Sequence, residues 1–161
     1  MVTIEYLHKN MHHVPLLSHL WWSLLGRIWA PDVGTDVVES WMYSWKHEDK
    51  LPVGHVALAE GRPIGFCALQ KNDGLRSELT PWLTDLCVDP AYQRHGVGRQ
   101  LIQKTENKAY DLGFKKLYLF AFDVTLPEYY QRLGFSVIGL DRHRGSSIIV
   151  MEKTLSKLAR L

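Results

Sequence analysis

Cysteine, net charge and long apolar runs are all scarce in this sequence. The two cysteines, Cys67 and Cys87, cannot build a disulfide framework, which favours a reducing compartment. The formal net charge of +2 gives no electrostatic reason to expect a nucleic-acid partner. The apolar segment over residues 15–28 contains two serines, a histidine and an arginine, so it fits neither a signal peptide nor a membrane span. We therefore expect a soluble cytoplasmic protein without nucleic-acid or membrane partners.

Two common nucleotide-binding motifs are also missing. The sequence has no Gly-x-x-x-x-Gly-Lys-Ser/Thr match, which excludes a P-loop. A dinucleotide fingerprint would need a third glycine where Leu101 stands, and residues 89–94 make the connection from strand to glycine too long for its tight turn. Asp123, at the end of the next expected strand, could still imitate the acid that binds a ribose. NAD or nucleotide binding is therefore kept as an alternative.

Length and composition indicate one globular domain over residues 1–161. The chain is long enough for one hydrophobic core, and its 46% hydrophobic and 22% charged residues argue against disorder. The apolar periodicity predicts the order β-α-α-β-β-β-α-β-α-β-β, which is typical of an α/β fold with a mixed sheet. The strands are expected at residues 1–7, 54–60, 63–70, 82–88, 115–122, 135–140 and 146–153, and the helices at residues 15–28, 36–45, 97–112 and 127–133.

The segment QRHGVGR, residues 93–99, has the features of an anion site at the start of a helix. The first N–H groups of a helix lack intrahelical partners, and the helix dipole makes that end electropositive. Gly96 and Gly98 would let the backbone approach phosphate oxygens. Arg94 and Arg99 would add charged contacts. An ordinary glycine-bearing turn explains the two glycines equally well, so both interpretations stay open on this segment alone.

The longer segment LCVDPAYQRHGVGRQLI resembles the acetyl-CoA-binding segment of the GNAT family of N-acetyltransferases. Their signature is Arg or Gln, two residues, Gly, one residue, and Gly or Ala, which Gln93, Gly96 and Gly98 match. The VDP that ends the preceding strand and the later YYQRLGF follow the family's order. The resemblance implies a single domain with a mostly antiparallel sheet flanked by helices. It also implies acetyl-CoA as cosubstrate, no metal, and transfer of the acetyl group to a primary amine by direct attack in a ternary complex.

The resemblance assigns the cofactor to two neighbouring segments. The pantetheine arm would lie along the strand before the loop, at Leu86, Cys87 and Val88, where relatives have a bulge and polarise the acetyl carbonyl. The pyrophosphate would bind the loop and the helix start, at Gln93, Arg94, His95, Gly96, Val97, Gly98 and Arg99. Asp123 stands where many relatives carry an asparagine that contacts the cofactor arm. A carboxylate cannot donate that hydrogen bond unless it is protonated.

The resemblance also suggests an acid and a base. Tyr130 in YYQRLGF matches the tyrosine that donates a proton to the departing CoA thiolate. Asp85, on the strand beside the cofactor, and Glu78, in the loop before it, are candidates for the base that deprotonates the amine. Strict alternation would place Asp85 on the face opposite Thr84 and Leu86. We take Tyr130 as the acid and Asp85 as the base.

Other features bear on the acceptor and on the alternatives. Five of the six tryptophans lie within residues 21–45, and some of their rings could form an aromatic cage for a cationic amine. The DRHRG segment at residues 141–145 is expected to be a solvated hairpin tip. The HKNMHH run at residues 8–13 has no identifiable fourth ligand, so no metal site is expected. We expect a small-molecule or peptide amine as acceptor. A homodimer through an edge strand and a non-catalytic acyl-CoA sensor stay open.

Overall fold

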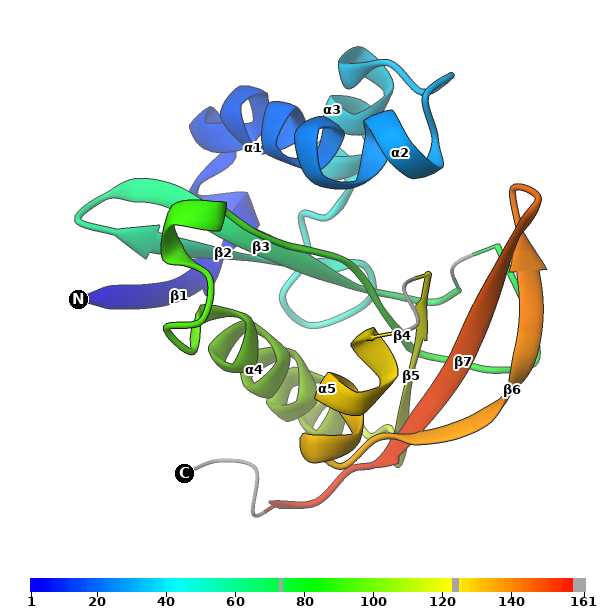
Figure 1. The fold of residues 1–161 in the computed structure, drawn as a ribbon. Helices are drawn as coiled ribbons and strands as arrows, with labels where there is room; N and C mark the ends of the chain where they lie inside the picture. Colours follow the sequence, from blue (N-terminus) through cyan, green and yellow to red (C-terminus); the bar gives the residue numbers. More distant parts are fainter. Residues whose placement is uncertain (73, 123–124, 158–161) are drawn as a thin grey trace.

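A seven-stranded sheet forms the centre of the computed structural model, which describes residues 1–72, 74–122 and 125–157 (Figure 1). Its strands are β1 (Val2–Tyr6), β2 (Val53–Ala59), β3 (Arg62–Gln70), β4 (Trp82–Val88), β5 (Lys116–Ala121), β6 (Ser136–His143) and β7 (Ser146–Thr154). They lie in the order β1-β2-β3-β4-β5-β7-β6. The pairing of β4 with β5 is parallel, and the other pairings are antiparallel. The predicted mixed, mostly antiparallel sheet is thus confirmed.

Helices cover both faces of the sheet (Figure 1). On one face lie α1 (Val14–Trp21), the π-helical turn η3 (Trp22–Gly26), α2 (Arg27–Trp29) and α3 (Thr35–Ser44). On the other face lie α4 (Val97–Asp111) and α5 (Leu126–Arg132). Short 3₁₀ turns are η1 (Leu7–Lys9), η2 (Met11–His13) and η4 (Pro90–Tyr92). The order of strands and helices follows the sequence prediction, with the first expected helix interrupted at η3.

Apolar side chains fill the space between the helices and the sheet on both faces. Trp45 and Phe66 are buried under α1 and α3, while Ile102 and Leu117 are buried between α4 and the sheet. Complete burial of one such side chain contributes about 1.5–3 kcal/mol. These two layers hold the central strand β4 in place from above and below.

Below the sheet, α4 covers a buried polar cluster. His55 Nδ1 lies 3.1 Å from Thr105 Oγ1, and Cys67 Sγ lies 3.2 Å from the same hydroxyl. Burial, together with the positive charges of nearby lysines, lowers the pKa of His55 to about 4. The imidazole is therefore neutral in the folded protein at pH 7.

The buried His55 predicts a loss of stability in mild acid. The unfolded imidazole binds a proton near pH 6.5 and the folded one only near pH 4, so the unfolded state gains more protons as the pH falls through that window. We expect the free energy of unfolding to fall by about 3 kcal/mol across it because of this group. Urea unfolding of the wild type and His55→Gln over a pH series measures this. The variant should lose that part of the pH dependence, and equal slopes for the two proteins contradict the assignment.

One outer edge of the described sheet is β6. Its apolar side chains Val137 and Leu140 are 45% and 74% exposed. Homodimer formation through this edge stays a prediction.

Candidate active site

Strand β4 carries a bulge at its centre. Asp85 and Leu86 together stand opposite the single residue Cys67 of β3, where the register shifts. Asp85 has a φ of 57°, and a bulge of this kind bends the strand. The described ladder between β4 and β5 consists of the pair Trp82–Tyr118, at the start of β4. Two cavities meet at the bulge.

The first cavity has a volume of about 940 Å³ and lies between the start of α4 and α5; we call it the loop cavity. Most of the predicted cofactor-binding residues line it: Leu86, Val88, Gln93, Arg94, Gly96, Gly98 and Arg99. Later turns of α4, the helix α5 and Lys153 of β7 form the rest of its wall. The fold thus brings the glycine loop and the end of β4 to one cavity.

The start of α4 is open and electropositive. Gly96 precedes the helix with a φ of 82°, a conformation that favours glycine. A Cβ on Gly98 would lie 3.1 Å from the Tyr129 hydroxyl, so any side chain there would narrow the space between α4 and α5. The first turn contains no acidic residue, and Arg94 and Arg99 are exposed beside it. This end of the helix is suited to bind an anion.

The remaining predicted cofactor residues are placed differently. The Cys87 side chain is 3% exposed and belongs to the core cluster of Phe66, on the face of α1 and α3. Val97 is buried in the core, and His95 is exposed without lining the loop cavity. For these residues a backbone contact with a cofactor stays a prediction. Asp123 lies outside the described residues, so its predicted contact also stays a prediction.

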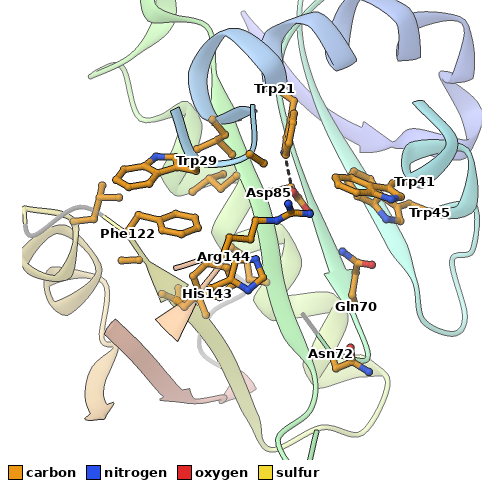
Figure 2. Close-up of a pocket in the computed structure, with 18 of the residues that line it drawn as sticks. Trp21, Trp29, Trp41, Trp45, Gln70, Asn72, Asp85, Phe122, His143 and Arg144 are labelled. Carbon is orange, nitrogen blue, oxygen red and sulfur yellow. Dashed lines mark hydrogen bonds between the residues drawn. The ribbon is translucent and has the colours of Figure 1, made fainter. Parts of the chain in front are cut away.

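The second cavity has a volume of about 380 Å³ and lies under α1, α2 and α3; we call it the aromatic cavity (Figure 2). Its aromatic walls are Trp21, Trp29, Trp41, Trp45, Phe120 and Phe122. Figure 2 shows Asp85 between Trp29 and Phe122 on one side and Trp41 on the other. The loop cavity lies on the side of β4 that α4 and α5 cover, and the aromatic cavity lies on the side that α1, α2 and α3 cover.

The two cavities share Leu86, Leu126 and Tyr130. Tyr130 is 7% exposed, and its ring packs against Tyr129 and Phe135 at centroid distances of 5.3 Å and 5.9 Å. Burial raises the pKa of Tyr130, so the phenol carries its proton at neutral pH. A group in one cavity can meet a group in the other beside Tyr130 and the bulge.

Hydrogen bonds fix the Asp85 carboxylate in the aromatic cavity. Trp21 Nε1 donates to Asp85 Oδ1 at 2.9 Å, and the Thr84 hydroxyl also donates to the carboxylate. Gln70 Nε2 donates to Thr84 Oγ1 at 2.7 Å, which leaves the Thr84 proton for Asp85. Burial raises the pKa of Asp85, and these hydrogen bonds and the nearby His143 only partly oppose the rise. A carboxylate with a raised pKa is suited to accept a proton near neutrality.

The other candidate base lacks such surroundings. Glu78 is exposed and lines neither cavity. The prediction that Asp85 and Leu86 lie on opposite faces of β4 holds, because Asp85 bonds Trp21 on the α1 side while Leu86 packs against the α4 side. The prediction is wrong for Thr84, whose side chain lies beside that of Asp85. The extra residue of the bulge breaks the two-residue period at this point.

Residues 16–135 match the acetyltransferase (GNAT) family. This chain belongs to that family. The matched range includes the bulged strand, the glycine loop and Tyr130. Membership supports the acetyltransferase interpretation over an acyl-CoA sensor or an NAD-binding protein.

Solved structures share the fold of this GNAT chain. A ribosomal-protein-S18-alanine N-acetyltransferase from Escherichia coli has a TM-score of 0.71 at 22% identity, covering 97% of this chain and 95% of that one. An aminoglycoside 6′-N-acetyltransferase complexed with coenzyme A has a TM-score of 0.69 at 18% identity, covering 94% and 96%. An acetyltransferase from Salmonella typhimurium, solved with its cofactor acetyl-CoA, has a TM-score of 0.73 at 18% identity, covering 98% and 95%.

A curated relative extends the comparison to a longer protein. The tRNA(Met) cytidine acetyltransferase of Haemophilus influenzae is 24% identical over 125 residues, or 78% of this GNAT chain. The chain spans 18% of that relative's length.

Across the described ranges, no three His, Cys, Asp or Glu side chains are grouped so that they could hold a metal ion. None of the helices in the same ranges combines the length and the apolar character needed to cross a membrane.

Sequence reasoning missed the role of His143 and the bond between Trp21 and Asp85 in this GNAT site. Residue His143 of the expected solvated hairpin tip is partly buried, lines the aromatic cavity and packs 5.2 Å from the Phe120 ring, so that prediction is wrong for it. Trp21, the partner of Asp85, lies 64 residues before it in the chain. No local pattern marks such contacts, because they form only when the helices and the hairpin pack against β4.

Proposed function

We propose that this chain is an acetyl-CoA-dependent N-acetyltransferase that transfers the acetyl group to a primary amine by direct attack in a ternary complex. The observation that supports this most is the meeting of the loop cavity and the aromatic cavity at Leu86 and Tyr130. A thioester lying along β4 and an amine held in the aromatic cavity would meet beside the bulge. Family membership, and related structures that contain coenzyme A or acetyl-CoA, support the choice of cosubstrate.

The loop cavity fits the anionic and pantetheine parts of acetyl-CoA. Backbone N–H groups at the start of α4 and the side chains of Arg94 and Arg99 are suited to bind the pyrophosphate. Gly98 keeps the wall near Tyr129 open. The bulge leaves its extra residue outside the strand ladder, so a backbone N–H near Leu86 is available to stabilise negative charge on the acetyl oxygen.

Asp85 acts as the base for the amine, and Tyr130 acts as the acid for the departing thiolate. Asp85 accepts a proton from the ammonium group, and the free amine attacks the carbonyl carbon of the thioester. The C–N bond forms and the C–S bond breaks. Tyr130 donates its phenolic proton to the departing thiolate, and the second proton of the attacking nitrogen returns the tyrosinate to the phenol. Both groups line the aromatic cavity.

The state of the cysteines favours direct attack over an acetyl-cysteine intermediate. Burial raises the pKa of Cys67 to about 12 and raises the pKa of Cys87 well above its ordinary value. A nucleophilic cysteine needs a depressed pKa or an adjacent base. Both thiols are free and buried, which also suits the cytoplasmic location we propose.

Acetyl-CoA binding, measured by isothermal titration, tests the assignment of the loop cavity. The wild type should bind acetyl-CoA and desulfo-CoA saturably. Gly98→Val should weaken binding by about tenfold, or about 1.4 kcal/mol, because the added side chain meets the Tyr129 hydroxyl. Gln100→Val, on an exposed position of the same helix, is the matched control and should bind normally. Absence of CoA binding, or binding of NAD alone, contradicts the proposed function.

A further inference from the structure

Four aromatic side chains of the aromatic cavity form two packed pairs. Trp29 of α2 and Phe122, just after β5, are stacked at a centroid distance of 4.6 Å and an interplanar angle of 8°. Trp21 and Trp41 meet edge to face at 5.6 Å and 85°. In Figure 2 the two pairs stand on different sides of Asp85. A flat apolar group between them would have aromatic contacts on more than one side.

The charge distribution in this cavity favours one ammonium group. Among the described residues that line it, Asp85 carries the single carboxylate. The nearest side chains of the hairpin tip, His143 and Arg144, add no negative charge, and Arg144 Nη1 lies 3.3 Å from Asp32 Oδ1 outside the cavity. Within the described part of the cavity wall, a second ammonium group of a polyamine or an aminoglycoside would face Arg144 or the aromatic rings and find no further carboxylate.

The cavity has the volume of a small-molecule site. Its volume of about 380 Å³ is near the lower end of the range for small-molecule sites, roughly 300–1,000 Å³. Asp85 stands next to Leu86, at the junction with the loop cavity, so the amine must lie at this inner end. The rest of the acceptor then extends between the aromatic walls.

We propose that the acceptor is a small primary monoamine with an aromatic ring on a short carbon chain. Its ammonium group pairs with Asp85, and its ring packs against the Trp29–Phe122 stack and Trp41. This inference rests on the proposed acetyl transfer and specifies the acceptor for it.

The experiment measures CoA release with the full chain, acetyl-CoA and a panel of amines. 2-Phenylethylamine and tryptamine represent the proposed class, and n-butylamine supplies the chain without the ring. Spermidine, kanamycin and a peptide with a free N-terminal alanine represent the other classes. We expect kcat/KM for the arylalkylamines to exceed that for n-butylamine by about 30-fold or more, since ring burial against aromatic walls adds contact energy of a few kcal/mol.

Variants separate ring recognition from general damage. Trp29→Ala and Phe122→Ala should each raise KM for 2-phenylethylamine by about tenfold, because one face of the ring site is lost, and should change n-butylamine kinetics much less. Trp22→Ala is the matched control, because Trp22 is 40% exposed on the neighbouring turn and does not line the cavity. Titration of 2-phenylethylamine into protein saturated with desulfo-CoA gives the same comparison without turnover.

The outcomes distinguish this inference from the proposed function. Faster acetylation of spermidine, kanamycin or the peptide than of either arylalkylamine overturns the inference and leaves the proposed function standing. Equal effects of Trp29→Ala on 2-phenylethylamine and n-butylamine, or acetyl-CoA binding without acetylation of either arylalkylamine, also overturn it. A chain that neither binds acetyl-CoA nor acetylates any amine overturns both.

Discussion

Replacing Asp85 with asparagine is expected to lower kcat/KM for the amine by about 10²- to 10⁴-fold, because the variant lacks the base that deprotonates the ammonium group. Asparagine keeps the size of the side chain and can still accept the hydrogen bond from Trp21 Nε1. The position of the β4 bulge should therefore be unchanged. Steady-state rates with a saturating concentration of acetyl-CoA give the effect directly.

The pH dependence gives a second readout for Asp85. Protonation of the carboxyl removes the base, so wild-type kcat/KM should fall as the pH drops through the raised pKa of Asp85. The asparagine variant should lack that acidic limb, while its affinity for acetyl-CoA stays unchanged. Glu78→Gln, in the exposed loop, is the matched control and should keep both the rate and the pH profile. A wild-type rate for Asp85→Asn contradicts the assignment.

The Tyr130→Phe variant is expected to lower kcat by about 10²-fold, because the departing thiolate no longer receives a proton. The ring contacts with Tyr129 and Phe135 are kept in phenylalanine, so stability and acetyl-CoA affinity should change little. Rapid-quench measurement of one turnover places the loss in the chemical step.

The neighbouring tyrosine provides the comparison for this variant. Tyr129 lines only the loop cavity, and its hydroxyl lies near Gly98. Tyr129→Phe should therefore affect KM for acetyl-CoA more than kcat. Equal kcat losses for Tyr129→Phe and Tyr130→Phe contradict a specific role for Tyr130 as the acid.

Local sequence patterns predicted the order of the elements and the glycine loop before α4. Gly113 and Gly134 end the helices α4 and α5 as expected, with φ of 95° and 98°. The glycine loop before α4 was found because all its relevant residues lie within residues 93–99. Such features depend on backbone conformation over a few neighbouring residues, which the sequence displays directly.

The parts of the site that depend on long-range packing could not be predicted. The bulge at Asp85 arises from the pairing of β4 with β3, and it places the Asp85 side chain on the same face as that of Thr84. His143 enters the aromatic cavity only because the β6–β7 hairpin folds back beside β5. The tryptophan-rich segment suggested an aromatic cage. The π-helical turn η3 and the packing of α3 then decide which of its rings face Asp85.

Initial rates with acetyl-CoA and the most reactive amine of the panel both varied test the central claim most directly. If the two cavities deliver both substrates to one junction, double-reciprocal plots should intersect, and the mass of the protein incubated with acetyl-CoA alone should not change. Parallel plots, together with a protein that gains the mass of an acetyl group, would show a covalent intermediate and contradict direct transfer between the loop cavity and the aromatic cavity.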